Sequence, residues 1–212
     1  MMGVDDFSPE SIARTAFFTG HRVLTEKERS GIADSLFRCM LQAYDEGYRR
    51  FLCGCALGFD TIAAHQTVRL REHYPDVILS LAIPCAGQPD RWKEKDREEY
   101  RRIISLADEK TVLSPVYYQG VMLERNRYMA DRSSLCICYL THMRGGTASA
   151  VRYALIHDRI RIVNLAVLRE TETESLRENA WNFMFISPSV PENAVIAPLC
   201  LMPRKNLSMR HI

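Results

Sequence analysis

The chain has no long apolar run. No stretch of its 212 residues approaches the roughly 18 to 20 consecutive apolar residues that a membrane-spanning helix needs. The first ten residues carry Asp5, Asp6 and Glu10 and no basic residue, so they match neither a secretory signal nor a transit peptide. We therefore expect a cytoplasmic protein that makes no membrane contact.

A strong charge of one sign is also lacking. Lys and Arg number 28 and Asp and Glu number 26, for a net charge of +2. This balance excludes a basic polyelectrolyte but leaves room for a local basic site. The composition, 47% hydrophobic and 25% charged, is typical of a soluble globular protein. The length fits one large domain, or one domain with an appendage.

Signals for disulfides and metals are weak. Cysteine occurs seven times, an odd number, and several copies lie inside apolar segments, as Cys136 and Cys138 do. Cys53 and Cys55 form a Cys-x-Cys pair rather than the Cys-x-x-Cys spacing of many metal sites. A reactive thiol is conceivable, but buried, reduced cysteines are the better interpretation. We expect no metal site.

Short apolar segments alternate with helical patterns along most of the chain. The segments that are typical of buried strands are residues 15–19, 50–53, 77–83, 110–113, 135–140 and 161–165. The first helix has a capping-box spacing, with Thr25 three residues before Glu28, and an apolar face that begins at Ile32. Six strands separated by helices predict an α/β fold, with a doubly wound, mainly parallel sheet covered by helices on both faces.

Three glycine-containing loops follow predicted strands and precede helices. They are residues 19–22 (Thr-Gly-His-Arg), 54–60 (Gly-Cys-Ala-Leu-Gly-Phe-Asp) and 141–147, which ends in Gly-Gly-Thr. Glycines at a helix start expose backbone N–H groups to an anion. The guanidinium of Arg22 can donate two parallel hydrogen bonds to a phosphate. None of the loops matches the Gly-x-Gly-x-x-Gly fingerprint or a Walker P-loop. Each alone could be a tight turn, but a doubly wound sheet brings all three to one edge.

Further candidates lie outside these loops. Arg125 and Arg127 suit a phosphate, although a solvated helix face would also explain them. Trp92, with Gln88 four residues before it, could stack on a base or begin the apolar face of a helix.

Among the candidates for a catalytic role, Asp60 and His21 are the best placed, and the evidence for each is weak. We expect Asp60 to act as a helix N-cap and not as a catalytic carboxylate. His21 has no partner that the sequence reveals. The sequence therefore does not identify the catalytic residues.

The ordered set of these motifs resembles the SLOG (SMF/DprA–LOG) superfamily. The motifs are Thr-Gly-His-Arg at 19–22, Gly-x-Ala-x-Gly-x-Asp at 54–60 with Ala64-His65, Arg-Asn-Arg at 125–127 and Gly-Gly-Thr at 145–147. Together with Pro84, Gln88 and Trp92 they are most similar to the uncharacterised YpsA-like family. The resemblance covers residues 14–167 and implies a Rossmann-like nucleotide-binding fold. We therefore expect a nucleotide-binding domain over residues 14–168, and a C-terminal appendage over residues 169–212 that is not a separate domain.

Two relatives in the superfamily imply different activities. DNA-processing protein A binds single-stranded DNA, but the near-neutral charge of this chain does not favour a long nucleic-acid contact. The Lonely Guy phosphoribohydrolases cleave nucleoside monophosphates and carry Pro-Gly-Gly-x-Gly-Thr-x-x-Glu. Here Ala150 stands where that glutamate would be, and cleavage of an N-glycosidic bond needs a carboxylate near the ribose.

We therefore predict binding or sensing of a nucleotide or nucleotide-derived ligand, with no cofactor required. The alternatives are a nucleotide N-glycosidase and DprA-like binding of single-stranded nucleic acid. The expected partner is a small phosphorylated molecule, and homo-oligomerisation is compatible with the sequence. The expected ligand-binding residues are Thr19, Gly20, His21, Arg22, Gly54, Gly58, Asp60, Gln88, Trp92, Arg125, Arg127, Gly145, Gly146 and Thr147.

Overall fold

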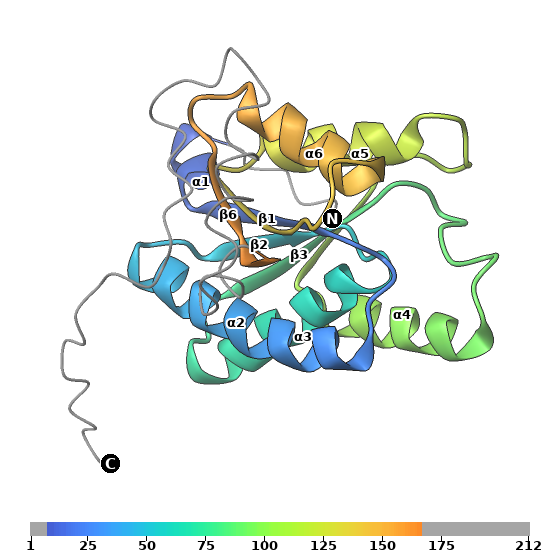
Figure 1. Ribbon diagram of the computed structural model, residues 1–212, viewed down its shortest axis with the longest axis horizontal. Helices are drawn as coiled ribbons and strands as arrows, with labels where there is room; N and C mark the ends of the chain where they lie inside the picture. The colour runs from blue at the N-terminus through green and yellow to red at the C-terminus, as the bar shows by residue number, and fades with distance from the viewer. Residues whose placement is uncertain (1–7, 167–212) are drawn as a thin grey trace.

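A computed structural model describes residues 8–166 of the chain, and Figure 1 shows their arrangement. Six parallel strands form one sheet in the order β4-β3-β2-β1-β5-β6. The strands are β1 (Thr15–Gly20), β2 (Arg50–Cys53), β3 (Ile78–Ile83), β4 (Glu109–Val112), β5 (Leu135–Tyr139) and β6 (Arg161–Asn164). This confirms the predicted α/β fold with a doubly wound parallel sheet.

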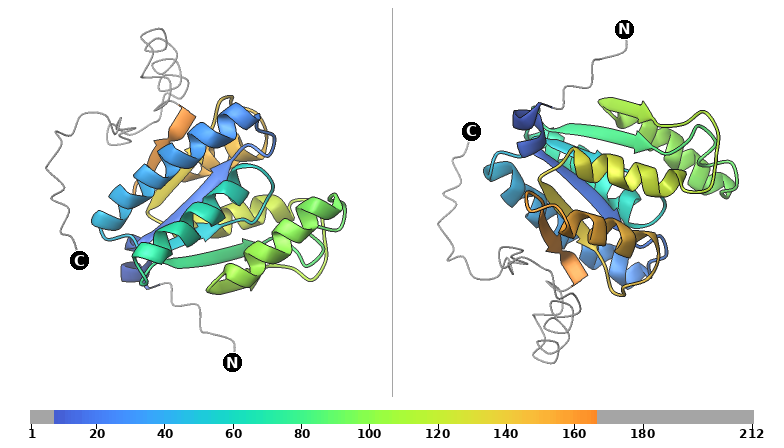
Figure 2. Two further views of the ribbon diagram at one scale, coloured as in Figure 1. Left: turned by 90° about the horizontal axis from the view of Figure 1, so that it is seen from below. Right: turned by 90° about the horizontal axis from the view of Figure 1, so that it is seen from above.

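Helices cover both faces of the sheet. They are α1 (Pro9–Ala13), α2 (Glu26–Asp45), α3 (Phe59–His73), α4 (Glu94–Leu106), α5 (Val121–Asp131) and α6 (Gly145–Leu155). Helices α2, α3 and α4 lie against one face and α5 and α6 against the other (Figures 1 and 2). None of the described helices is long and apolar enough to span a membrane.

Alternating strand residues supply the two cores. Phe18 of β1 and Phe51 of β2 face the layer of α2 and α3, where their rings stack with centroids 5.9 Å apart. Phe17 and Cys136 face the layer of α5 and α6. Because both faces of the sheet are covered, every residue of β5 is buried, which explains why this strand reads as a continuous apolar run.

Local signals in the sequence set several element boundaries. Helix α2 begins after Thr25, whose hydroxyl accepts from the Glu28 N–H while the Glu28 carboxylate accepts from the Thr25 N–H, so the predicted capping box is present. Two differences from the sequence prediction concern helices. Helix α1 was not predicted, and α4 begins at Glu94, so Trp92 precedes the helix instead of opening its apolar face. The predicted appendage, residues 169–212, lies outside the described residues.

Candidate functional site

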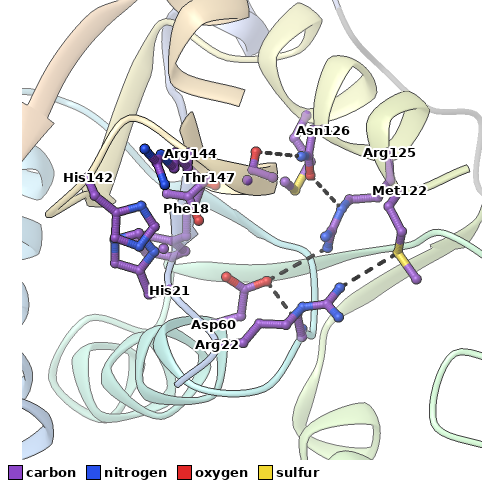
Figure 3. A pocket seen from close by; sticks show the side chains of 16 residues that line it. Phe18, His21, Arg22, Asp60, Met122, Arg125, Asn126, His142, Arg144 and Thr147 are labelled. Carbon is purple, nitrogen blue, oxygen red and sulfur yellow. Dashed lines mark hydrogen bonds and ion pairs between the residues drawn. The ribbon is translucent and has the colours of Figure 1, made fainter. Parts of the chain in front are cut away.

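The order of the strands creates a reversal point between β1 and β5. The chain runs outward from β1 through β2, β3 and β4, and then returns to place β5 on the other side of β1. In open parallel sheets ligands bind beyond the carboxyl ends of the strands at this point. A cavity of about 360 Å³ opens here (Figure 3). It is lined by residues 18–22, Ala56, Asp60, Met122, Arg125, Asn126, Met129, His142 and residues 144–147.

The loop after β1 packs directly on the start of α3. The N–H of Phe59 donates to the carbonyl of His21 at 3.1 Å. Gly58, the N-cap of α3, has φ +80, and a Cβ there would lie 2.3 Å from the carbonyl oxygen of Arg22. Only glycine permits both the backbone angle and this approach. Gly58 therefore supports the loop that carries His21 and Arg22 and does not line the cavity itself.

Arg125 and Asp60 form a buried ion pair at the floor of the cavity. The side chains are each 6% exposed, and the Arg125 Nη1 lies 3.7 Å from the Asp60 Oδ2. The same carboxylate oxygen accepts from the N–H of Ala56 at 3.2 Å. A Cβ at Gly54 would lie 1.4 Å from Arg125 Nη1. Gly54 is therefore the residue that makes room for the guanidinium beneath the second loop.

One nitrogen of this ion pair has no hydrogen-bond partner. Arg125 donates through Nε to the Asn126 Oδ1 at 3.0 Å, but its buried Nη1 has no hydrogen-bond partner. Burial raises the pKa of Asp60, and the positive charge of Arg125 opposes this shift. Burial likewise lowers the pKa of Arg125, opposed by Asp60. In both groups burial disfavours the charged form and the charge of the partner favours it, as in other buried ion pairs.

Asn126 connects Arg125 to the third loop. Its Nδ2 donates to the carbonyl of Gly146 at 3.4 Å, so one side chain contacts both the guanidinium and the first turn of α6. The N-cap of α6 is Arg144, which makes no side-chain cap bond, and the first turn contains no acidic residue. The N–H groups of this turn therefore lie at the cavity with the positive end of the helix dipole.

Two histidines stand on the side of the cavity away from Arg125 (Figure 3). The rings of His21 and His142 stack with centroids 4.3 Å apart and an interplanar angle of 18°. The His21 Nε2 accepts from the N–H of Thr141 at 3.0 Å. This bond requires an unprotonated Nε2, which agrees with the pKa of His21 being lowered, first by burial and second by the nearby His142, against an opposing effect of Glu28.

The predicted binding residues separate into two groups. Those that line the cavity are Thr19, Gly20, His21, Arg22, Asp60, Arg125, Gly145, Gly146 and Thr147. Those that do not line it are Gly54, Gly58, Gln88, Trp92 and Arg127.

The members of the second group have structural contacts. Gln88 donates to the carbonyls of Gly54 and Cys55 at 3.2 and 3.0 Å, so it holds the second loop from behind. Trp92 lies edge-on to Tyr100 with ring centroids 5.5 Å apart. Arg127 is exposed and its guanidinium lies 5.5 Å from the ring centroid of Tyr153.

The expected N-cap role of Asp60 is wrong. Gly58 is the N-cap of α3, and Asp60 lies within the first turn, where its carboxylate bonds the Ala56 N–H and faces Arg125. Our ligand-binding set also omitted Met122, Asn126, His142 and Arg144, which line the cavity. His142 and Arg144 belong to the third predicted loop, residues 141–147, and Asn126 is the central residue of the Arg-Asn-Arg motif at 125–127. The sequence could therefore have indicated these three residues.

The described part of the chain contains no cluster of three or more His, Cys, Asp or Glu side chains that could hold a metal ion. The six cysteines of that part are free and buried. Burial raises the pKa of Cys55 to about 12 and that of Cys53 well above its ordinary value. These thiols beside the second loop are therefore protonated and poor nucleophiles.

Comparisons with known proteins place the chain in a family. Residues 23–159 match the model of the YspA SLOG family (YpsA). A UPF0398 protein of Bacillus velezensis is 30% identical over 104 residues, which are 48% of this chain and 57% of that relative. The UPF0398 protein YpsA of Bacillus subtilis is 30% identical over 91 residues, 42% of this chain and 51% of that relative. The chain thus matches somewhat over half the length of these relatives.

Among solved structures, the X-ray structure of DNA processing protein A from Streptococcus pneumoniae is similar in fold. The TM-score is 0.52 at 16% sequence identity, over 72% of this chain and 50% of that chain. At this identity the similarity concerns the fold alone, and it supports the Rossmann-like arrangement of strands and helices described above.

Proposed function

The chain belongs to the YspA SLOG family, and we propose that it binds a nucleotide or nucleotide-derived ligand through a phosphate in the cavity between β1 and β5. The observation that carries this proposal is the Arg125 guanidinium. Arg125 lines the cavity, and its buried Nη1, 3.7 Å from the Asp60 Oδ2, has no hydrogen-bond partner. A buried donor without an acceptor costs free energy, and a phosphate oxygen in the cavity would accept from this guanidinium.

The first turn of α6 supports the same ligand class. The residues of this turn line the cavity, the N-cap makes no side-chain bond, and no acidic residue neutralises the helix dipole. Helix N-termini of this kind bind phosphate and sulfate groups. Asn126 bonds both this turn and Arg125, so the two anion-binding elements are held together as one site.

The charge of the cavity fits a compact anion. Three arginines line it, Arg22, Arg125 and Arg144, with the single carboxylate of Asp60. Counted over these four side chains, the lining carries two positive charges in excess. A phosphomonoester carries about 1.5 to 2 negative charges at pH 7. One phosphate group would neutralise the site, whereas a long nucleic acid would need cationic groups spread along a track.

A binding or sensing role is favoured over catalysis. Asp60 is the one carboxylate among the residues that line the cavity. It already bonds the Ala56 N–H and faces Arg125, which leaves it poorly placed to activate water. The position three after Thr147 is Ala150, where a hydrolytic relative carries glutamate. Hydrolysis of nucleoside monophosphates is the second candidate, because one carboxylate, that of Asp60, does line the cavity.

The test is to identify what the protein binds. The protein is purified, denatured, and its supernatant analysed by mass spectrometry; thermal shifts are then recorded with nucleoside mono-, di- and triphosphates and with an oligodeoxythymidylate. We expect a phosphorylated small molecule in the extract, and a thermal shift with one nucleotide class that is absent from the charge-balanced variant D60N/R125M. A phosphate-free extract without any nucleotide shift would overturn the proposal. A shift with the oligonucleotide alone, steeply weakened by salt, would replace it with nucleic-acid binding.

Release of free base from the nucleotide distinguishes the catalytic alternative. We expect none above the rate measured without protein. Release that disappears in Asp60→Asn, while ligand binding persists, would establish hydrolysis instead.

A further inference from the structure

The stacked pair of His21 and His142 has no part in phosphate binding as described above. The rings lie nearly parallel, with centroids 4.3 Å apart, and both side chains line the cavity. In Figure 3 they stand on one side of the cavity, with Arg125 and Asn126 on the opposite side. A phosphate bound at Arg125 would therefore leave the remainder of its molecule free to extend toward the histidines.

The inner member of the pair is held in place by the fold. His21 Nε2 accepts from the Thr141 N–H, and the Thr141 Oγ1 lies 3.0 Å from the same nitrogen. The ring also meets Tyr139 edge-on, with centroids 6.2 Å apart. These contacts tie the loop after β1 to the loop after β5. His21 thus forms a fixed, uncharged support against which the second imidazole lies.

The outer member, His142, is exposed. Within the described part of the chain, its only contact with another aromatic ring is the stack on His21. An exposed aromatic ring fixed by a neighbour presents a flat face to a ligand, and such a face binds nucleobases by stacking with little preference among them. Two nearly parallel rings do not converge on a common point, so the pair is poorly arranged to coordinate one metal ion.

We propose that His142, supported by His21, is the platform on which the base of the bound nucleotide stacks. This inference rests on the proposed function, since it takes the phosphate to lie at Arg125 and the first turn of α6. The ligand would then span the cavity, with its phosphate at the arginine side and its base at the histidine side. His142 would distinguish a nucleotide from a sugar phosphate that lacks a base.

The experiment compares two kinds of ligand by titration calorimetry on the full chain. The probes are the nucleoside 5′-monophosphates of adenine, guanine, cytosine and uracil, and ribose 5-phosphate, which keeps the phosphate and sugar alone. Stacking on one aromatic side chain corresponds to about 5- to 150-fold in affinity. We expect His142→Ala to weaken the tightest-bound nucleotide by this factor and to change the affinity for ribose 5-phosphate by less than about twofold.

Two further variants make the result specific. His142→Phe keeps a flat ring and should restore most of the nucleotide affinity. His73→Ala removes an exposed histidine at the far end of α3 and should leave both affinities unchanged. Equal weakening of both ligands by His142→Ala, no weakening of either, or failure of His142→Phe to restore affinity would overturn the platform. If the wild-type protein binds none of these probes and shows no thermal shift with nucleoside di- or triphosphates, the proposed function fails, and the platform fails with it.

Discussion

Substitution of Gly54 by alanine tests how tightly Arg125 is held beneath the second loop. A Cβ at this position would lie 1.4 Å from the Arg125 Nη1, 2.3 Å from its Cζ and 2.8 Å from the Asp60 Oδ2. The guanidinium would have to move by about 2 Å to regain an ordinary contact of 3.4 Å. Because the side chain is 6% exposed, it cannot move without disturbing its neighbours.

The expected cost follows from two effects. Forcing extra volume into a packed interior costs about 1 to 3 kcal/mol, and removing one partner of a buried ion pair costs about 3 to 5 kcal/mol. Since Arg125 is displaced and not deleted, we expect Gly54→Ala to lower the free energy of unfolding by about 3 kcal/mol. For a protein of this size that corresponds to a fall in Tm of roughly 6 to 12 °C.

Urea denaturation of Gly54→Ala and Gly146→Ala measures this cost against a matched control. A Cβ at Gly146 meets no heavy atom within 4 Å, so that variant should lie within about 0.5 kcal/mol of wild type. In an Arg125→Ala background most of the cost of Gly54→Ala should vanish, because the clashing group is gone. The reasoning is refuted if Gly54→Ala is as stable as Gly146→Ala, or equally costly in both backgrounds.

Three other predictions concern the same domain. The double variant D60N/R125M should be at least as stable as wild type by urea denaturation, because removing both partners of a buried ion pair is often neutral or stabilising. Each single variant should lose about 3 kcal/mol, because it leaves the other partner buried without its counterpart, and a double variant less stable than both singles would contradict this. Folding lowers the pKa of His21 below its ordinary value of 6.5, so the neutral ring stabilises the fold fully above pH 6.5, and this stabilisation is lost as the pH falls from 6.5 through the lowered pKa. His21→Gln should therefore reduce the fall in Tm between pH 7.5 and pH 5. A variant with the same dependence of Tm on pH as the wild type would contradict this prediction. Thr25→Ala removes the capping-box hydroxyl of α2 and should lower the free energy of unfolding by about 1 kcal/mol, whereas Thr25→Ser should lower it by less than half of that.

The sequence predicts the sheet well for a physical reason. Strands of a parallel sheet that is covered on both faces are continuous apolar runs, and β5 (Leu135–Tyr139) is such a run. The capping box at Thr25 and Glu28 is local, so its two partners can be read directly from their spacing. The strand-end loops could be placed at one edge because parallel strands bring their carboxyl ends together.

The contacts between those loops could not be predicted in the same way. Arg125 and Asp60 are 65 residues apart in number and meet only because α5 and α3 flank the same strand ends. An N-cap role for Asp60 is the natural local interpretation, and it is wrong because Gly58 takes that position with φ +80. The stack of His142 on His21 likewise joins the ends of two strands that only the sheet order makes neighbours.

The most direct test of the central claim is titration calorimetry of the best-bound nucleotide against the wild type and D60N/R125M. The account predicts saturable binding of one molecule per chain in the wild type, and at least a hundredfold weaker binding in the variant, because the unpartnered Arg125 donor is removed. Equal affinity in the two proteins, with the fold of the variant intact, would show that the cavity between β1 and β5 is not the phosphate site.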